Sequence, residues 1–252
     1  MVRKKLRSIC FTIFNRLENN NNADFHSNGE QRFLSDFFST FRKDVILFDI
    51  GANVGEYSEI LIEECKKFNI NYFLHVFEPT KSCYEILEKK FNCNKNVFLN
   101  NVGVSEFQAT TKIYYDVENS GFASLYKRDL DFLNVNIVKE ETISLICLEE
   151  YFSARKIPRI DFLKLDIEGH ELFALKGMGK FLNADFIKAI QFEYGGANID
   201  SRTFLLDLFR LLESKGFKVG KVLNNRIEFR NYNSWMENFQ YANYIAVNNK
   251  KS

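Results

Sequence analysis

The chain has 252 residues, of which 46% are hydrophobic and 27% charged, with 12 glycines and 2 prolines; this composition excludes collagen-like, proline-rich and fully disordered chains. Its formal net charge is +1, because 34 lysines and arginines nearly balance 33 aspartates and glutamates. A balanced charge excludes a broad nucleic-acid-binding surface, although it is compatible with a small local basic patch.

The first segment, residues 1–17, places four basic residues ahead of the apolar run Ile9–Phe14. This run has about six residues, fewer than the roughly seven to fifteen of a signal-peptide core, and no small-residue cleavage site follows it. We therefore predict a short basic amphipathic helix. We favour an arm that is docked on the domain or frayed, with contact to a membrane surface or to a partner as the alternative.

The run Asn19–Asn22 has too few apolar residues to pack, so we place a linker near residues 18–29. The chain then divides into an N-terminal basic arm with an asparagine-rich linker, residues 1–29, and one compact domain, residues 30–252. In this domain, apolar residues first recur at helical spacing as far as Phe41, which predicts a helix before the first strand.

The segments that follow alternate between strand and helix patterns. Val45–Ile50 is a continuous apolar run that ends at Gly51, which is typical of a strand buried on both faces of a parallel sheet. The same patterns predict helices at residues 56–68, 81–91, 148–155, 171–176 and 202–215, and strands at residues 72–77, 97–100, 111–115, 142–147, 160–165, 187–192, 217–222 and 241–247. Such alternation indicates βαβ units, so we predict an α/β fold with a doubly wound, mostly parallel sheet and helices on both faces.

Two polar turns are predicted near the mouth of a site. The stretch Glu118–Ser124 lies in the least regular part of the chain and predicts a surface loop or a lid. Tyr194–Gly196 follows a strand and predicts a flexible turn. Phe122 and Tyr194 can each offer an aromatic face to a ligand, and ordinary loop residues are the alternative.

The strongest local signal is the turn after the first strand, where Asp49, Gly51 and Gly55 stand in the pattern Asp-x-Gly-x-x-x-Gly. Glycines let the backbone approach a ligand, and the following helix start offers free N–H groups. The pattern is not the dinucleotide fingerprint, and no lysine follows as in a phosphate-binding loop. Glu78 ends the next strand, where a carboxylate can accept hydrogen bonds from both hydroxyls of a ribose. These four residues fit an adenosyl ligand without a phosphate, and a tight turn without a ligand is the alternative.

Four candidate catalytic residues follow the later strands: Asp166, Glu168 and His170 after one, and Glu193 after the next. Parallel strands bring their carboxyl ends to the same edge of the sheet. There the acids can deprotonate a hydroxyl or hold a divalent metal that does so. The alternatives are acids that stabilise a helix start and a histidine that caps it. Lys164 lies inside a buried strand and needs an ionic partner such as Asp166.

Three segments together carry a family resemblance: Phe48–Ser58 (FDIGANVGEYS), Val76–Pro79 (VFEP) and Asp161–Glu171 (DFLKLDIEGHE). They resemble the FkbM family of class I S-adenosylmethionine-dependent methyltransferases, over about residues 44–247. The resemblance implies a Rossmann-like sheet of seven strands with the last one antiparallel. It implies that the first two motifs hold S-adenosylmethionine, which adds Asn53 to the cofactor residues. It also places Gly103 and Val104 beside the adenine.

By the same resemblance, the family reactions are mostly O-methylations of sugar or polyketide hydroxyls. The leading hypothesis is therefore an O-methyltransferase that acts on a hydroxyl of a saccharide, a glycan or a related small molecule. Two alternatives are a nucleic-acid methyltransferase and an inactive adenosyl-binding module. The chain lacks an Asn-Pro-Pro-aromatic or Pro-Cys motif, which argues against the first, and the glycine turn with Glu78 argues against the second.

The chain has five cysteines, and no two have the two-residue spacing of a zinc or redox pair. We interpret them as small apolar residues in a reducing compartment, which predicts a cytoplasmic location. No segment reaches the roughly 20 apolar residues that span a membrane. No motif in the chain specifies the acceptor, a metal or the oligomeric state.

Overall fold

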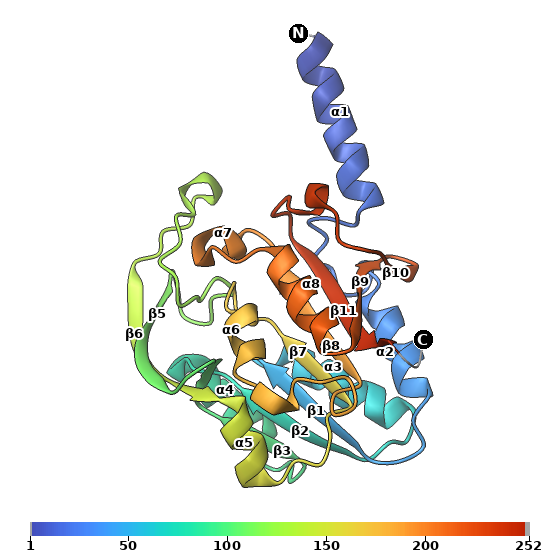
Figure 1. Ribbon diagram of the computed structural model, residues 1–252. Coiled ribbons are helices and arrows are strands. Elements are labelled where there is room, and N and C mark those ends of the chain that lie inside the picture. Colours follow the sequence, from blue (N-terminus) through green and yellow to red (C-terminus); the bar gives the residue numbers. More distant parts are fainter. Residues whose placement is uncertain (1, 250–252) are drawn as a thin grey trace.

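Within residues 2–249, which the computed structural model describes, an eight-stranded sheet forms the centre of the protein (Figure 1). Its strands are β1 (Val45–Ile50), β2 (Tyr72–Phe77), β3 (Val97–Asn100), β7 (Phe162–Leu165), β8 (Ala189–Tyr194), β9 (Phe217–Leu223), β10 (Arg226–Phe229) and β11 (Ala242–Asn248). Their order across the sheet is β10-β9-β11-β8-β7-β1-β2-β3. The strands from β8 to β3 are parallel, and β11 is antiparallel to both of its neighbours.

The fold class is the predicted one, but the sheet has eight strands in the described part of the chain rather than seven. The additional strand is β10, which the chain forms by turning back at Asn224 and Asn225 to pair antiparallel with β9. β10 is a short edge strand whose residues are exposed or half-buried. It therefore lacks the continuous apolar run by which the buried strands can be recognised in the sequence.

Helices cover both faces of the sheet because successive strand residues point to opposite sides. Leu47 packs with α2 (Glu30–Ser39), α3 (Glu56–Lys67) and α4 (Lys81–Phe91). Phe48 packs on the other face, where α5 (Leu148–Arg155), α6 (Glu171–Lys176) and α8 (Leu205–Ser214) lie. The helix expected at residues 202–215 is α8, which begins later, at Leu205. A separate short helix, α7 (Ala197–Ser201), precedes it and ends at Arg202, whose φ is 56°. Short 3-10 helices span Asp131–Leu133, Gly179–Phe181 and Ser234–Met236.

A second sheet, with three strands among the described residues, stands beside the main one. It consists of β4 (Gly103–Ser105), β5 (Ala109–Tyr115) and β6 (Lys139–Cys147), in the order β4-β6-β5. The segment 116–138 connects β5 to β6 and contains the polar stretch expected to be a loop or a lid.

The asparagine run is packed, so the expectation that residues 18–29 are an unpacked linker is wrong. Asn19 donates to the carbonyl oxygens of Asn28 (2.7 Å) and Val222 (3.1 Å), and all three asparagines at positions 19, 20 and 28 are buried. Asn20 accepts a 2.6 Å hydrogen bond from the buried Lys221. Side-chain amides hold much of the segment, and Phe25 adds one apolar contact with the ring of Tyr57. A single aromatic residue gives no apolar periodicity, so the packing cannot be recognised from the sequence pattern.

By contrast, α1 (Val2–Leu17) extends away from the rest of the protein (Figure 1), and none of its residues is buried. Among the described residues, no helix combines the length and the apolar character needed to cross a membrane.

Candidate active site

A pocket lies at the carboxyl ends of β1, β2, β7 and β8, and the second sheet forms one of its walls. All the predicted site residues line it except two. Those that line it are Gly51, Asn53, Glu78, Gly103, Val104, Asp166, Glu168, His170 and Glu193. The two others, Asp49 and Gly55, are buried outside the lining. The topology therefore brings together residues that are up to 142 positions apart, counted from Gly51 to Glu193.

The glycines of the turn after β1 are required by contacts within the protein. Gly51 has a φ of +85°, and a Cβ atom there would lie 1.8 Å from the carbonyl oxygen of Asp166. Gly55 has a φ of +84°, and its Cβ atom would lie 2.6 Å from the side chain of Leu87. Both positions combine a left-handed backbone with a close approach, which only glycine accommodates without strain. The turn is thereby pressed against the end of β7, at the floor of the pocket.

Asp49 lies beneath this turn and is fully buried. Its Oδ2 accepts a 2.6 Å hydrogen bond from Ser58 on α3, and its Oδ1 has no partner among the described residues. Burial raises the pKa of Asp49, while the positive charge of Lys164 opposes the rise. Asp49 thus ties β1 to the start of α3.

Glu78 is 6% exposed and lines the pocket at the end of β2. Its Oε1 accepts from the N–H (2.8 Å) and the hydroxyl (2.6 Å) of Thr80, and its Oε2 accepts from the N–H of Asn53 (2.9 Å). Burial raises the pKa of Glu78, and these hydrogen bonds counter the rise. A carboxylate oxygen has two lone pairs, so Oε2, which accepts from the N–H of Asn53, can accept a further hydrogen bond from a ligand.

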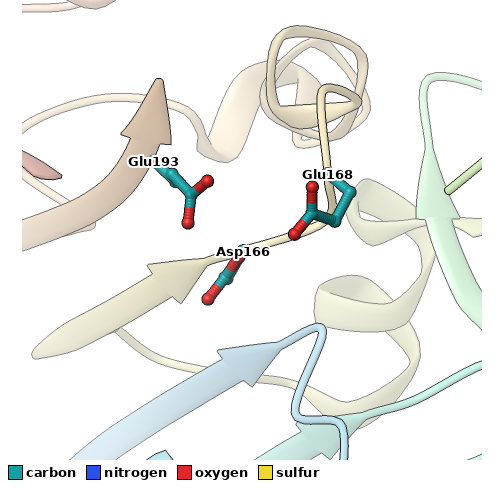
Figure 2. Close-up of side chains that lie close together, drawn as sticks. All are labelled: Asp166, Glu168 and Glu193. Carbon is teal, nitrogen blue, oxygen red and sulfur yellow. The ribbon is translucent and has the colours of Figure 1, made fainter. Parts of the chain in front are cut away.

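Asp166, Glu168 and Glu193 form an acidic cluster in the same pocket (Figure 2), with one carboxylate oxygen of each residue within 4.8 Å of the other two. Burial, and then repulsion by Asp166, raises the pKa of both Glu168 and Glu193. Carboxyl groups with raised pKa values can take up a proton near neutral pH. Three carboxylates at this spacing are also the oxygen ligands that hard divalent cations prefer.

Two cations balance part of this negative charge. The ammonium group of Lys164 donates a 2.7 Å hydrogen bond to Oδ2 of Asp166, which is the ionic partner expected for this buried lysine. Lys164 also lies 4.3 Å from the centre of the Tyr57 ring. The second cation is Arg128, whose Nη1 donates to Glu168 at 2.6 Å.

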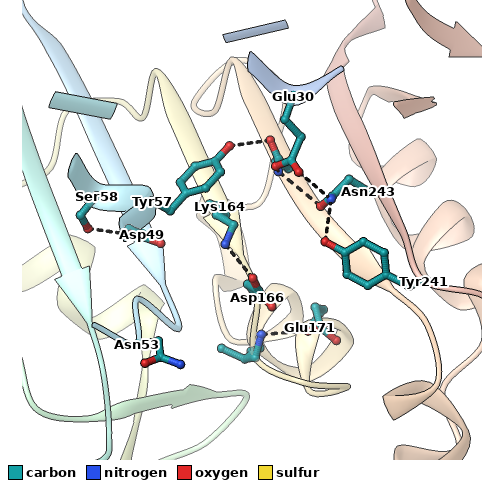
Figure 3. Close-up of polar contacts among 12 residues, drawn as sticks. Glu30, Asp49, Asn53, Tyr57, Ser58, Lys164, Asp166, Glu171, Tyr241 and Asn243 are labelled. Carbon is teal, nitrogen blue, oxygen red and sulfur yellow. Dashed lines mark hydrogen bonds and ion pairs between the residues drawn. The ribbon is translucent and has the colours of Figure 1, made fainter. Parts of the chain in front are cut away.

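A buried polar layer continues from Lys164 under the sheet edge (Figure 3). Tyr57 donates a 2.8 Å hydrogen bond to Gln191 on β8, and Gln191 in turn donates to Glu30 at the start of α2. Glu30 also accepts from Asn243 on β11 at 3.0 Å. The layer therefore links α2, α3, β8 and β11 beneath the acidic cluster.

His170 is held on both ring nitrogens. Nδ1 lies 2.8 Å from the hydroxyl of Tyr126, and Nε2 lies 3.0 Å from the hydroxyl of Ser105. Burial lowers the pKa of His170 to about 4, so the ring is neutral at physiological pH. The ring also stacks on Phe173, with their centres 4.8 Å apart. These contacts favour a fixed, neutral side chain that joins the second sheet to the start of α6.

Glu168 has an unusual backbone, with a φ of 50° next to Gly169 at 97°. The left-handed region is costly for a residue with a long side chain and is found mainly where surrounding structure enforces it. Here the hydroxyl of Ser124 donates to the carbonyl oxygen of Glu168 (2.8 Å), and Arg128 binds its carboxylate. The strained conformation aims the carboxylate of Glu168 at the other two acids (Figure 2).

Arg128, which contacts Glu168 of the pocket, is a residue that no sequence motif indicates. It lies in the segment 116–138, and besides Glu168 it contacts Asp200 of α7 through Nε at 3.3 Å. This segment has no hydrophobic periodicity, and an arginine in such a stretch is read as a solvated residue. The same segment reaches the glycine turn, because the side chain of Asn53 donates to the carbonyl oxygen of Ser120 at 3.1 Å.

Tyr194 is not at the mouth of the pocket, contrary to expectation. It is 1% exposed, packs in the core and donates a 2.6 Å hydrogen bond to Glu237. The strand β8 continues through Tyr194, so the alternation of strand side chains turns it inward. Phe122 remains half-buried on the loop, 5.9 Å from the guanidinium carbon of Arg128.

Comparisons with known proteins give one family match over more than half of the chain and several more distant likenesses. The model of the methyltransferase FkbM domain matches residues 49–219. Hexuronic acid methyltransferase AglP of Haloferax volcanii is 26% identical over 160 residues, which cover 62% of this chain and 59% of that protein, so the match spans less than two thirds of the relative. A solved structure of precorrin-6y C5,15-methyltransferase from Geobacter metallireducens has a TM-score of 0.44 and 11% identity, covering 86% of this chain and 87% of that one. Fibrillarin from Aeropyrum pernix with bound S-adenosyl-L-methionine has a TM-score of 0.44 and 11% identity, covering 81% and 66%.

Proposed function

This chain belongs to the FkbM family of methyltransferases, whose methyl donor is S-adenosylmethionine, and we propose that its acceptor is a hydroxyl of a saccharide or a related small molecule. The observation that carries the proposal is that Glu78 and the acidic cluster line one pocket. Glu78 could then bind the ribose of the cofactor, next to carboxylates that could accept the proton of the acceptor hydroxyl. The name of the relative AglP, a hexuronic acid methyltransferase, supports a sugar as the acceptor class.

The residues of the pocket fit the adenosyl part of the cofactor. Glu78 would hold the ribose hydroxyls, because its Oε2 retains acceptor capacity after binding the N–H of Asn53. Val102 and Val104 line the same pocket and would flank the adenine, next to the backbone of Gly103. A Cβ atom at Gly103 would lie 2.7 Å from the end of the Leu145 side chain, which would then have to shift, so glycine keeps this backbone close to the wall of the pocket. When bound, S-adenosylmethionine supplies an electrophilic methyl group.

The acidic cluster would orient the acceptor hydroxyl and receive its proton. We assign the proton first to Asp166, because Lys164 occupies its Oδ2 and Oδ1 remains for the acceptor. Glu168 and Glu193 would share the proton, since their raised pKa values favour the protonated form. One general base contributes about a hundred- to ten-thousand-fold to a rate, and correct alignment of the acceptor contributes more. His170 has both nitrogens engaged and a lowered pKa, so we assign it to the pocket wall rather than to proton transfer.

The acceptor class is tested by methyl transfer from labelled S-adenosylmethionine to matched glycosides. We would offer a glucoside, the corresponding glucuronide, a macrolide with free hydroxyls and a short RNA. Label on either sugar, in a methyl ether that resists mild base, supports a saccharide hydroxyl. Label in a base-labile methyl ester on the glucuronide would show that the carboxylate is methylated, which contradicts the proposal that the acceptor is a hydroxyl. Label on the RNA alone would replace the proposal with a nucleic-acid methyltransferase.

We also propose a reducing compartment, such as the cytoplasm, for this protein. Its support is that the five cysteines, all within the described residues, are free thiols and two of them are buried. Mass spectrometry of thiols trapped in cells would find all five reduced, and a disulfide would contradict the proposal.

A further inference from the structure

The helix α1 (Val2–Leu17) is not packed against the body of the described chain along its length. It is helical over 16 residues, and none of these residues is buried. Its contact with the body of the protein is at its last turn, where the ring of Phe14 meets the ring of Trp235 with their centres 6.1 Å apart. It is therefore neither frayed nor docked, and its side chains are available to something outside the chain.

One side of α1 is a continuous apolar stripe. Val2, Leu6, Ile9, Ile13 and Leu17 follow one another at spacings of four, three, four and four residues, which aligns them along one face of a helix. Each is more than half exposed, from 53% for Ile13 to 80% for Val2. An exposed apolar face of this length on a helix marks a surface that is covered in the working protein.

The charge of α1 indicates what covers the stripe. Residues 2–17 contain five basic residues, Arg3, Lys4, Lys5, Arg7 and Arg16, and no acidic residue. The whole chain carries +1, so the remaining residues carry −4 and the positive charge is concentrated on this helix. A second copy of α1 would bring the same five charges and repel it, whereas an anionic lipid surface is complementary.

The arrangement of the charges fits the surface of a bilayer. At about 100° per residue, Arg3, Lys5 and Arg16 fall within about 90° of the centre of the stripe and so form its borders. Long basic side chains at such borders can reach lipid phosphates while the stripe enters the acyl region. The helix is about 24 Å long and carries five charges, so it lies in the plane of a membrane rather than across it.

We propose that α1 binds the surface of a membrane that contains anionic lipid, with Val2, Leu6, Ile9, Ile13 and Leu17 facing the acyl chains. The binding rests on the helix alone and does not depend on the methyl acceptor. It would hold the methyltransferase domain beside the membrane.

The test is co-flotation of the full chain with vesicles of phosphatidylcholine alone and of phosphatidylcholine with phosphatidylserine. Each basic residue near an anionic surface contributes about 1 kcal/mol, or about fivefold, so we expect at least a hundredfold tighter binding to the anionic vesicles, weakened by salt. The variant L6S/I9S/I13S should bind at least tenfold more weakly. The matched variant T12S/N15Q, outside the stripe, should bind like the wild type.

Two further outcomes would overturn the proposal. One is equal binding of the wild type and L6S/I9S/I13S to anionic vesicles. The other is a wild-type dimer in light scattering that becomes a monomer in this variant, which would assign the stripe to a second copy. Because α1 buries none of its residues, substitutions in it should leave the methyltransferase domain folded. Thermal unfolding and binding of S-adenosylhomocysteine, measured for every variant, check this.

Discussion

Arg128 donates a 2.6 Å hydrogen bond to Glu168 and thereby joins the loop between β5 and β6 to the turn that follows β7. The same guanidinium contacts Asp200 on α7, so three segments meet at one side chain that is 8% exposed. The pair fixes one wall of the pocket and, at the same time, supplies a positive charge to the acidic cluster.

Replacement of Arg128 by methionine should release the loop and change the titration of the site. Loss of the positive charge removes the influence that lowers the pKa of Glu168, so that pKa should rise further. We expect amide hydrogen exchange in residues 116–138 to become about tenfold faster or more, since a partly buried ion pair is lost. The pH profile of turnover should shift to higher pH. Arg128→Lys keeps the charge and should shift it less, while unchanged exchange would show that other contacts hold the loop.

Glu78→Gln should weaken binding of S-adenosylhomocysteine in calorimetric titration. Hydrogen bonds to a charged group contribute roughly 1.5–3 kcal/mol, so the affinity should fall about tenfold to a hundredfold. The matched control is Glu85→Gln, on the exposed side of α4, which should bind like the wild type. Gly51→Val is not a clean test, because its side chain would collide with the carbonyl oxygen of Asp166 and disturb the fold. Equal affinity of Glu78→Gln and wild type would remove Glu78 from the cofactor site.

Asp166→Asn should lower turnover by about a hundredfold or more, because it removes a proton acceptor while keeping the shape and the contact with Lys164. Affinity for S-adenosylhomocysteine should change less than turnover. Asp185→Asn, at an exposed position, is the control. Turnover near the wild-type rate would exclude Asp166 as the base.

The same assay separates two uses of the acidic cluster. If a divalent cation is held there, Glu193→Gln should be about as damaging as Asp166→Asn, and a chelator should inhibit the wild type. If the carboxylates act directly, a chelator should have no effect on turnover.

Glu171 should make the protein less stable as the pH rises. Burial raises the pKa of Glu171 from 4.5 to about 7, although the N–H groups of Ile167 and Gly169 donate to its Oε1. Between these two pH values the unfolded chain has lost the proton and the folded protein retains it, so the free energy of unfolding falls with rising pH. Glu171→Gln should remove up to about 1.4 kcal/mol of this fall per pH unit. Urea unfolding from pH 4.5 to 7.5 measures it, with the exposed Glu63→Gln as control; parallel curves for Glu171→Gln and wild type would contradict it.

Removal of α1 should leave the unfolding temperature unchanged, whereas removal of residues 18–29 as well should lower it. A variant that starts at Glu18 loses no buried residue and should unfold at about the wild-type temperature. A variant that starts at Glu30 leaves Lys221 without Asn20 and Glu18, and unpaired buried groups cost about 1–3 kcal/mol each. Its unfolding temperature should be lower by several degrees on the scale of about 2–4 °C per kcal/mol. Equal stability of the two variants would support the boundary at residue 30 drawn from the sequence.

The parts of the site that the sequence predicts are those at the ends of buried strands. Asp49, Glu78, Asp166 and Glu193 each end or follow an apolar run, and the parallel topology then brings them to one edge. Arg128 and the asparagine run could not be found in this way. Their contacts depend on polar side chains that meet partners far along the chain, and no local period marks such partners.

The left-handed backbone of Glu168 limits which residues can replace it during evolution without a change in stability. A left-handed conformation suits glycine or asparagine, yet the position holds a glutamate whose carboxylate is also buried among other acids. Both features lower the stability of the folded chain. If Glu168 takes part in catalysis as proposed, selection for a more stable protein and selection for an active one favour different residues at position 168.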